Sequence, residues 1–326
     1  NTNGALVTIQ DPLNNKRAFP GNIIPASRLT QIGKNVLNIF PLPNYVDPNP
    51  SRVYQWNYYT SQAGGYPRRT EILRVDYSPR ANWQMYLRLS NNADEQHTPY
   101  TTWVCGSVNF DLVPIIFRQP GRGANIHSTN TITPTVFNDL VAGVSQNTLT
   151  YYPEDYLRVD RKKLGIDIPQ RNPSLNPNNM IPNMTFGSIQ NYANPSMSNG
   201  VPYFNRNTIY SIVDNLSKIW ATHTFKAGIY IERTRKVQSA STDTRGTIKF
   251  DRDNTNNILD ANDAYANALL GNYDSYAEAT GRPRGDFFFT NTEFYVQDTW
   301  RVKRRLSLDY GVRFYADPPQ YDRKKQ

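Results

Sequence analysis

The segment 292–315, TEFYVQDTWRVKRRLSLDYGVRFY, alternates between apolar and polar residues on both sides of a short basic turn. In its first run Phe294, Val296 and Trp300 share one face, and Tyr295 is an exception on the opposite, polar face. One face of the second run carries Leu306, Leu308, Tyr310, Val312 and Phe314. A period of two predicts β-strands, and the short turn at 302–305 permits only an antiparallel hairpin.

Two environments suit such a hairpin. A strand of a transmembrane barrel has lipid on its apolar face and a wet lumen on its polar face. A strand on a soluble core shows the same alternation, and alternation by itself favours this second environment because soluble β proteins are more common.

The composition excludes a helical membrane protein. The 326 residues are 38% hydrophobic with a mean hydropathy of −0.66, and the longest apolar run, at 112–117, contains Pro114. This run is far shorter than the ~20 residues that a membrane helix needs. A barrel stays compatible because its strands contact lipid only at every second residue. The net charge of +9 comes from scattered Lys and Arg, so no nucleic-acid partner is predicted.

Three segments resemble the TonB-dependent outer-membrane receptors, and in particular their Oar-like group. The hairpin above, with YVQDTWRV at 295–302 and LSLDYGVRF at 306–314, is similar to a barrel hairpin of that family. So are FPGNIIPASRL at 19–29 with NIFPLPN at 38–44, and NLSKIWATHTFKAG at 215–228. The segments occur in the family's order over most of the chain.

The periodicity and this resemblance together predict an all-β fold, a segment of an antiparallel up-and-down transmembrane β-barrel with long extracellular loops. We expect a loop region with one short helix at 1–69 and a partial barrel at 70–326, without the plug domain of the family. The expected strands lie near 70–78, 82–91, 135–147, 207–220, 223–236, 287–301 and 305–315. The chain is interpreted as an internal piece of a longer receptor.

Three details of this organisation are also expected. A helix near 27–40 would be capped by Ser27, and a second short helix is expected at 261–270. The Asn- and Pro-rich stretch 148–206 is predicted to be a long irregular connection, which extracellular barrel loops tolerate better than compact soluble domains. One further strand is expected within 100–130.

The resemblance implies a function in the outer membrane of a Gram-negative bacterium. Such a transporter would bind a scarce nutrient (a siderophore, glycan, peptide or vitamin) and import it with energy from the TonB complex, which contacts a plug outside this stretch. Membrane lipid is then a partner, no cofactor is expected, and the protein is not an enzyme. Two alternatives stay open, namely a non-transporting surface, adhesion or interaction β-protein and a soluble β-rich hydrolase. No ligand-binding residue is assigned.

Acidic residues gather at 251–263, where Asp251, Asp253 and Asp260 are candidate calcium ligands because hard cations prefer oxygen. The segment lacks the glycine and the closing glutamate of an EF-hand loop, so a solvated acidic loop is the competing interpretation.

No catalytic motif is present. His97, His127 and His223 lie far apart in the sequence, and the lone Cys105 offers neither a disulfide nor a CxxC site. A hydrolase would require two of these histidines to share one cleft with a carboxylate and a hydroxyl.

Overall fold

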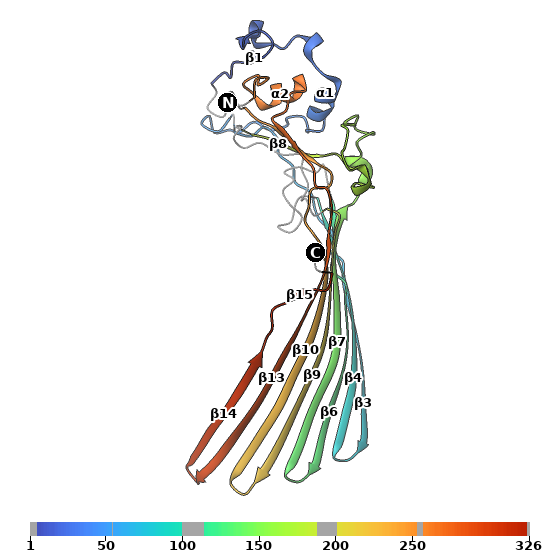
Figure 1. Ribbon diagram of the computed structural model, residues 1–326, viewed down its shortest axis with the longest axis vertical. Coiled ribbons are helices and arrows are strands. Elements are labelled where there is room, and N and C mark those ends of the chain that lie inside the picture. The colour runs from blue at the N-terminus through green and yellow to red at the C-terminus, as the bar shows by residue number, and fades with distance from the viewer. Residues whose placement is uncertain (1–4, 54, 100–113, 188–200, 253–256, 325–326) are drawn as a thin grey trace.

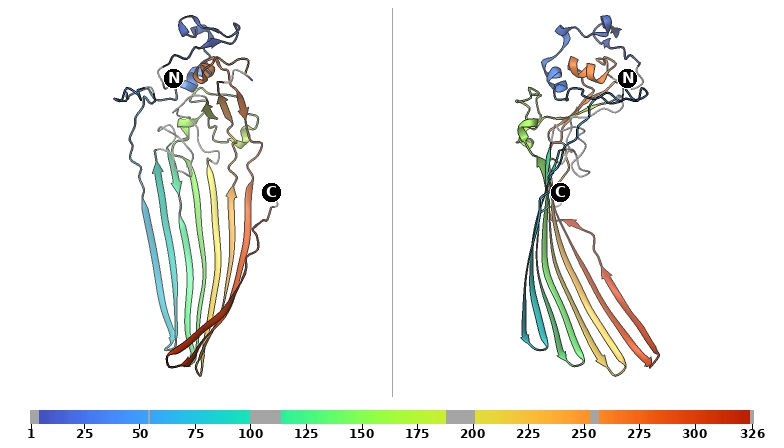
Figure 2. Two further views of the ribbon diagram at one scale, coloured as in Figure 1. Left: turned by 90° about the vertical axis from the view of Figure 1, so that its left-hand side faces the viewer. Right: turned by 180° about the vertical axis from the view of Figure 1, so that it is seen from behind.

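The computed structural model describes residues 5–53, 55–99, 114–187, 201–252 and 257–324. They form a large curved sheet with a smaller cap at one end (Figure 1). Tight turns lie at the far end of the sheet, and the connections between hairpins rise into the cap (Figure 2). Barrels of the outer membrane have short periplasmic turns and long extracellular connections, so the cap marks the extracellular end.

The large sheet has ten strands, and every pairing in it is antiparallel. Its members are β3 (Arg68–Arg80), β4 (Trp83–Thr98), β5 (Ile115–Arg118), β6 (Gly121–Thr133), β7 (Val136–Pro153), β9 (Tyr203–Trp220), β10 (His223–Ser239), β13 (Arg284–Lys303), β14 (Leu306–Ala316) and β15 (Tyr321–Asp322). The order is β14-β13-β10-β9-β7-β5-β4-β3, with β6 also between β4 and β7 and with β15 on β13.

The all-β antiparallel prediction is confirmed, and strands occur at all seven expected positions. The strand expected within 100–130 corresponds to β6, and β5 is an additional short strand. Most strands run further toward the cap than the sequence indicated. At 302–305 the turn is tighter than expected, since only Arg304 and Arg305 separate β13 from β14.

The two faces of the sheet differ in chemistry. Cross-strand register places Val296, Ala227 and Leu216 in one row of the first face. Exposed apolar side chains of this face include Val75, Leu87, Ile126, Ile212, Phe225, Ile229, Phe294, Trp300, Val312 and Phe314. The opposite face carries residues such as Gln297, Lys226 and Ser217. This is the division between a lipid-facing side and a polar lumen.

The cap contains β1 (Gln10–Asp11), β2 (Arg17–Ala18), η1 (Pro20–Asn22), η2 (Ala26–Arg28), α1 (Gln31–Leu37), η3 (Tyr156–Val159), η4 (Pro173–Leu175), β8 (Asn183–Phe186), β11 (Thr247–Phe250), α2 (Ala264–Leu270) and β12 (Ser275–Ala277). Strands β12, β11 and β8 form a separate small sheet in which β8 and β11 are parallel. Its apolar core unites distant segments, with Val36, Val159, Ile166, Met184, Phe186 and Ile248 all buried.

Two local expectations were wrong. Thr30 rather than Ser27 caps α1, because Ser27 lies within η2 and the Thr30 hydroxyl accepts from the amide of Gly33 at 3.0 Å. The described parts of 148–206 are also more than irregular loop. They extend β7, supply η3, η4 and β8, and begin β9.

No helix among the described residues is both long and apolar enough to cross a membrane.

Candidate ligand-binding site

The cap contains a cavity of about 810 Å³ between its two α-helices, its small sheet and the segment 168–171. The buried part of its lining is apolar and includes Val36, Ile248, Phe250 and Ala268. The more exposed part of the lining holds Thr30, Gln31, Ile32, Gln170, Arg171, Tyr273 and Tyr276. Small-molecule sites are typically concave and mostly apolar, with a few polar groups that orient the ligand. This cavity is therefore the candidate site.

Helices α1 and α2 form one wall of the cavity and cross in close contact. Thr30 joins them, since its amide donates to the Leu269 carbonyl at 2.9 Å and its hydroxyl to the same oxygen at 3.2 Å. Gly33 permits the approach, because a Cβ atom there would lie 2.2 Å from the carbonyl oxygen of Ala268. Asp263 caps α2 by accepting from the amide of Ala266 at 2.9 Å.

The carboxylate of Glu278 holds the segment 168–172 in place. It accepts from the backbone amides of Arg171 at 2.9 Å and Asn172 at 2.7 Å, and from the hydroxyl of Tyr276 at 2.5 Å. Burial acts to raise the pKa of Glu278, but these three donors outweigh it and the pKa lies below its usual value. Burial, reinforced by Glu278, raises the pKa of Tyr276 to about 12.

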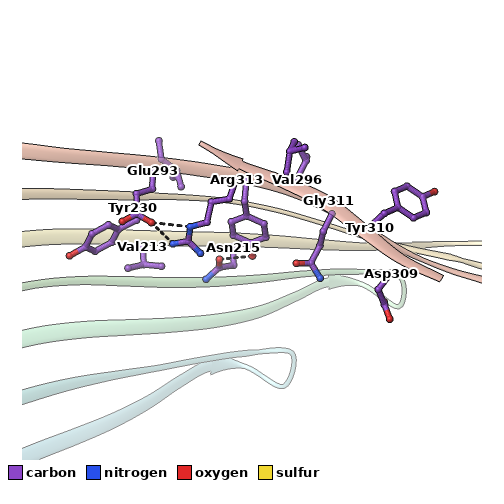
Figure 3. A pocket seen from close by; sticks show the side chains of 13 residues that line it. Val213, Asn215, Tyr230, Glu293, Val296, Asp309, Tyr310, Gly311 and Arg313 are labelled. Carbon is purple, nitrogen blue, oxygen red and sulfur yellow. Dashed lines mark hydrogen bonds and ion pairs between the residues drawn. The ribbon is translucent and has the colours of Figure 1, made fainter. Parts of the chain in front are cut away.

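A second hollow, of about 640 Å³, is lined mainly by residues of the lumen face of β9, β10, β13 and β14 (Figure 3). Arg313 donates to Glu293, with its Nε at 2.9 Å, and the Tyr295 hydroxyl donates to Asn215 at 2.9 Å. Tyr295 lies over Gly228, where a Cβ would come within 2.5 Å of the ring. The charged and amide side chains of this open hollow suit a wet lumen.

Of the candidate calcium ligands, the structure describes Asp251 and Asp260, and the side-chain amide of Asn267 donates both to the Asp251 carbonyl oxygen and to the Asp260 carboxylate. Asp251 forms an ion pair with Lys249 at 2.9 Å. Asp260 is fully buried and accepts from the side chain of Asn267 at 2.7 Å, while its Oδ2 has no hydrogen-bond partner among the described residues. Asp253 lies outside the described residues. No group of three or more His, Cys, Asp or Glu within the described ranges could hold a metal. A calcium site at 251–260 stays a prediction.

The three histidines lie on three different strands, and each has its own carboxylate. His97 contacts Glu95 and Glu154, and His127 contacts Asp139. The ring of His223 lies 2.6 Å from Asp298 and stacks on Phe225 and Trp300. Within the described ranges no two of these histidines share a carboxylate, so they do not form the arrangement that a hydrolase would require.

The sequence did not predict the residues that line this cavity. Its residues come from four short segments that lie far apart in the sequence, and two of them belong to the helices expected near 27–40 and at 261–270. A weak signal was present at 164–169 and 186–189, where apolar residues interrupt the polar connection. In the structure Ile166 and Phe186 are fully buried. Tyr151 of β7 and Tyr203 of β9 stack on each other, with their ring centroids 4.7 Å apart.

The sheet and cap together define a segment of a membrane β-barrel with an extracellular cap. The family model described as the outer membrane beta barrel domain matches residues 1–326, and the chain belongs to this family. Its location is therefore the outer membrane, where the apolar strand face contacts lipid. The alternative of a soluble hydrolase is not retained.

Comparison with solved structures gives the outer membrane transporter YddB from Escherichia coli, at 8% sequence identity and a TM-score of 0.44. The match covers 82% of this chain and 30% of the transporter chain. No curated protein matches.

Proposed function

We propose that this chain is part of a TonB-dependent outer-membrane transporter whose cap binds a scarce nutrient before import through the barrel. The cavity in the cap is the observation that carries the proposal. Its apolar inner lining and polar outer lining suit a ligand with both kinds of surface, such as a siderophore, vitamin, peptide or glycan. The plug and the TonB-contacting segment would lie outside this stretch.

The resemblance of three sequence segments to TonB-dependent receptors supports the energy-coupling part of the proposal. The polar lumen face supports a passage for a hydrated ligand, because its ion pairs and amide groups can exchange hydrogen bonds with a solute.

Uptake by cells tests this function. Cells producing the native full-length protein would be compared with a deletion strain for accumulation of ferric siderophores, cobalamin, oligosaccharides and peptides. We expect one of these classes to accumulate only with the protein present. Loss of the TonB complex should abolish accumulation but leave surface binding intact. Accumulation of none of the four classes would contradict the proposal.

A matched pair of variants links uptake to the cavity. Ile32 lines the cavity and is 42% exposed, whereas Ile23 is 70% exposed and does not line it. Ile32→Arg should lower affinity roughly tenfold or more, by filling space and by burying a charge against apolar walls. Ile23→Arg should behave as the wild type.

A non-transporting surface or adhesion protein is the second candidate. Several apolar side chains of the cap are largely exposed, among them Leu6, Leu13, Leu42, Val46 and Ile258. Exposed apolar surface of this kind is typical of interaction sites. Binding to cells or surfaces without uptake of any nutrient would favour this candidate.

A further inference from the structure

The lipid-facing side of the sheet changes from apolar to basic as the strands approach the cap. One cross-strand row of this face is formed by Ile231, Ile212, Ala142, Ile126 and Leu87. A row nearer the cap contains Arg235, Thr208, Gln146 and Arg122 on the same four neighbouring strands β10, β9, β7 and β6. Apolar contact with lipid tails therefore ends between these rows.

A hollow of about 430 Å³ lies at this change. It is lined by Gln146, Arg206, Thr208, Tyr210, Arg235, Val237, Arg284, Asp286 and Lys324. Its lining thus has four cationic side chains and one carboxylate. We call this group the basic hollow. Strands β7, β9, β10 and β13 carry most of it. Arg284 and Asp286 lie on β13 before the residues that pair with β14 and β15, and Lys324 follows β15.

Positive charge exceeds negative charge among the side chains that line the basic hollow. Arg235 is held by Asp286 through two hydrogen bonds, of 2.7 and 2.9 Å. Lys324 also interacts electrostatically with Asp286, whereas Arg206 and Arg284 form no ion pair with a carboxylate in the described ranges. The guanidinium groups of Arg206 and Arg284 lie over one ring, that of Phe204, at 5.4 and 4.3 Å from its centroid. Two guanidinium groups gathered at one ring add to the local positive potential, which favours binding of an anion.

The height of the basic hollow above the periplasmic turns matches the thickness of a bilayer. Near those turns Trp220, His223, Phe225 and Trp300 form an aromatic cluster, as expected at a membrane interface. Arg235 lies roughly ten residues beyond Phe225 on β10, or about 33 Å along the strand at ~3.3 Å per residue. A tilt of ~40° reduces this to about 25 Å, the height of the apolar band of an outer-membrane barrel.

We propose that the basic hollow binds the phosphate groups of an outer-leaflet lipid headgroup. Guanidinium groups bind phosphate through paired, charge-assisted hydrogen bonds, and an anionic lipid at this height can keep its acyl chains on the apolar face below. The inference is independent of the proposed transport, because the site faces lipid and not the lumen. Dissolved phosphate shares the same chemistry, so the experiment separates the two sources.

The experiment measures lipid binding to the native full-length protein in nanodiscs of phosphatidylcholine. The probes are bis-phosphorylated lipid A, its dephosphorylated form and inorganic pyrophosphate. We expect saturable binding of the phosphorylated lipid and weakening by added salt. The double variant Arg206→Gln/Arg284→Gln should lose about tenfold in affinity. The charge-preserving variant Arg206→Lys/Arg284→Lys should keep part of it.

A variant with the same charge change on the opposite face is the control. Lys226→Gln/Lys236→Gln alters two lumen-facing positions of β10 and should leave lipid affinity unchanged. An equal loss in both double variants would show non-specific attraction and overturn the proposal. So would equal binding of the dephosphorylated lipid, or pyrophosphate binding as tight as that of the lipid. Heat-modifiable migration on gels verifies that each variant is folded.

Discussion

At the scale of single residues, hydrogen bonds from polar side chains organise the cap as much as apolar packing does. Arg161 is 1% exposed, and its guanidinium donates to the carbonyl oxygens of Met180, Ile168 and Arg245. Burial lowers the pKa of Arg161. A buried cation is tolerated there because its nitrogens donate to backbone carbonyl oxygens. One side chain thereby joins three segments around the cavity.

The pH dependence of the segment 168–172 follows from Glu278. Because the folded-state pKa of Glu278 is lowered, its stabilisation is fully present above the unfolded pKa of ~4.3 and is lost as pH falls through the folded value. Hydrogen-exchange protection of the amides of Arg171 and Asn172, corrected for intrinsic rates, should therefore decrease below about pH 4.

Glu278→Gln should reduce that protection roughly tenfold at neutral pH, because the amide cannot replace both acceptor oxygens. Its dependence on pH between 3 and 6 should also disappear. Asp317→Asn, at an exposed position, serves as the control. Unchanged protection in Glu278→Gln would contradict this role.

At the scale of elements, the contact between α1 and α2 requires a glycine at position 33, although glycine is unfavourable within a helix. Alanine stabilises an isolated helix by about 1 kcal/mol relative to glycine. At Gly33, however, a Cβ would meet backbone atoms, the Ala268 oxygen at 2.2 Å and the Leu269 Cα at 2.8 Å. The two helices would have to separate, since backbone cannot rotate away.

We expect Gly33→Ala to destabilise the cap by about 2 kcal/mol, and Lys34→Ala on the same helix to change stability by less than ~0.5 kcal/mol. The measurement is the temperature at which the cap becomes sensitive to protease while the barrel stays resistant. A stabilised Gly33→Ala variant would show that helix propensity dominates and that the crossing is looser than described.

At the scale of the whole molecule, the position of the membrane follows from the register of the long sheet. Ile212 lies on the apolar face of β9, about midway between the aromatic cluster and the basic hollow. Its neighbour Ser211 faces the lumen beside Glu232. Substitutions at these two adjacent residues therefore test the lipid-facing side and the lumen-facing side of the barrel wall separately.

Ile212→Arg should cost about 2–4 kcal/mol, because a charge near the bilayer midplane is costly. Ser211→Arg should be tolerated, since the lumen is wet and Glu232 is close. The amount of heat-modifiable protein in outer-membrane fractions reports the difference. Equal amounts of the two variants would mean that the apolar face does not meet lipid.

The sequence by itself determined the hairpins of the barrel wall. Alternation with period two is a local property that adjacent strands share, so the segments 215–228 and 292–315 identified both the strands and the faces they present. The outer-membrane location followed from the same segments through their resemblance to a family.

Only the tertiary structure decided the cap cavity and the basic hollow. Thr30 and Leu269 come into contact across 239 residues, and Gln146 and Arg235 of the basic hollow align only through the registers of β7, β9 and β10. Contacts of this kind depend on how distant segments pack after the sheet has formed. No periodicity of a single segment encodes them, because each contributing residue is ordinary in its local context.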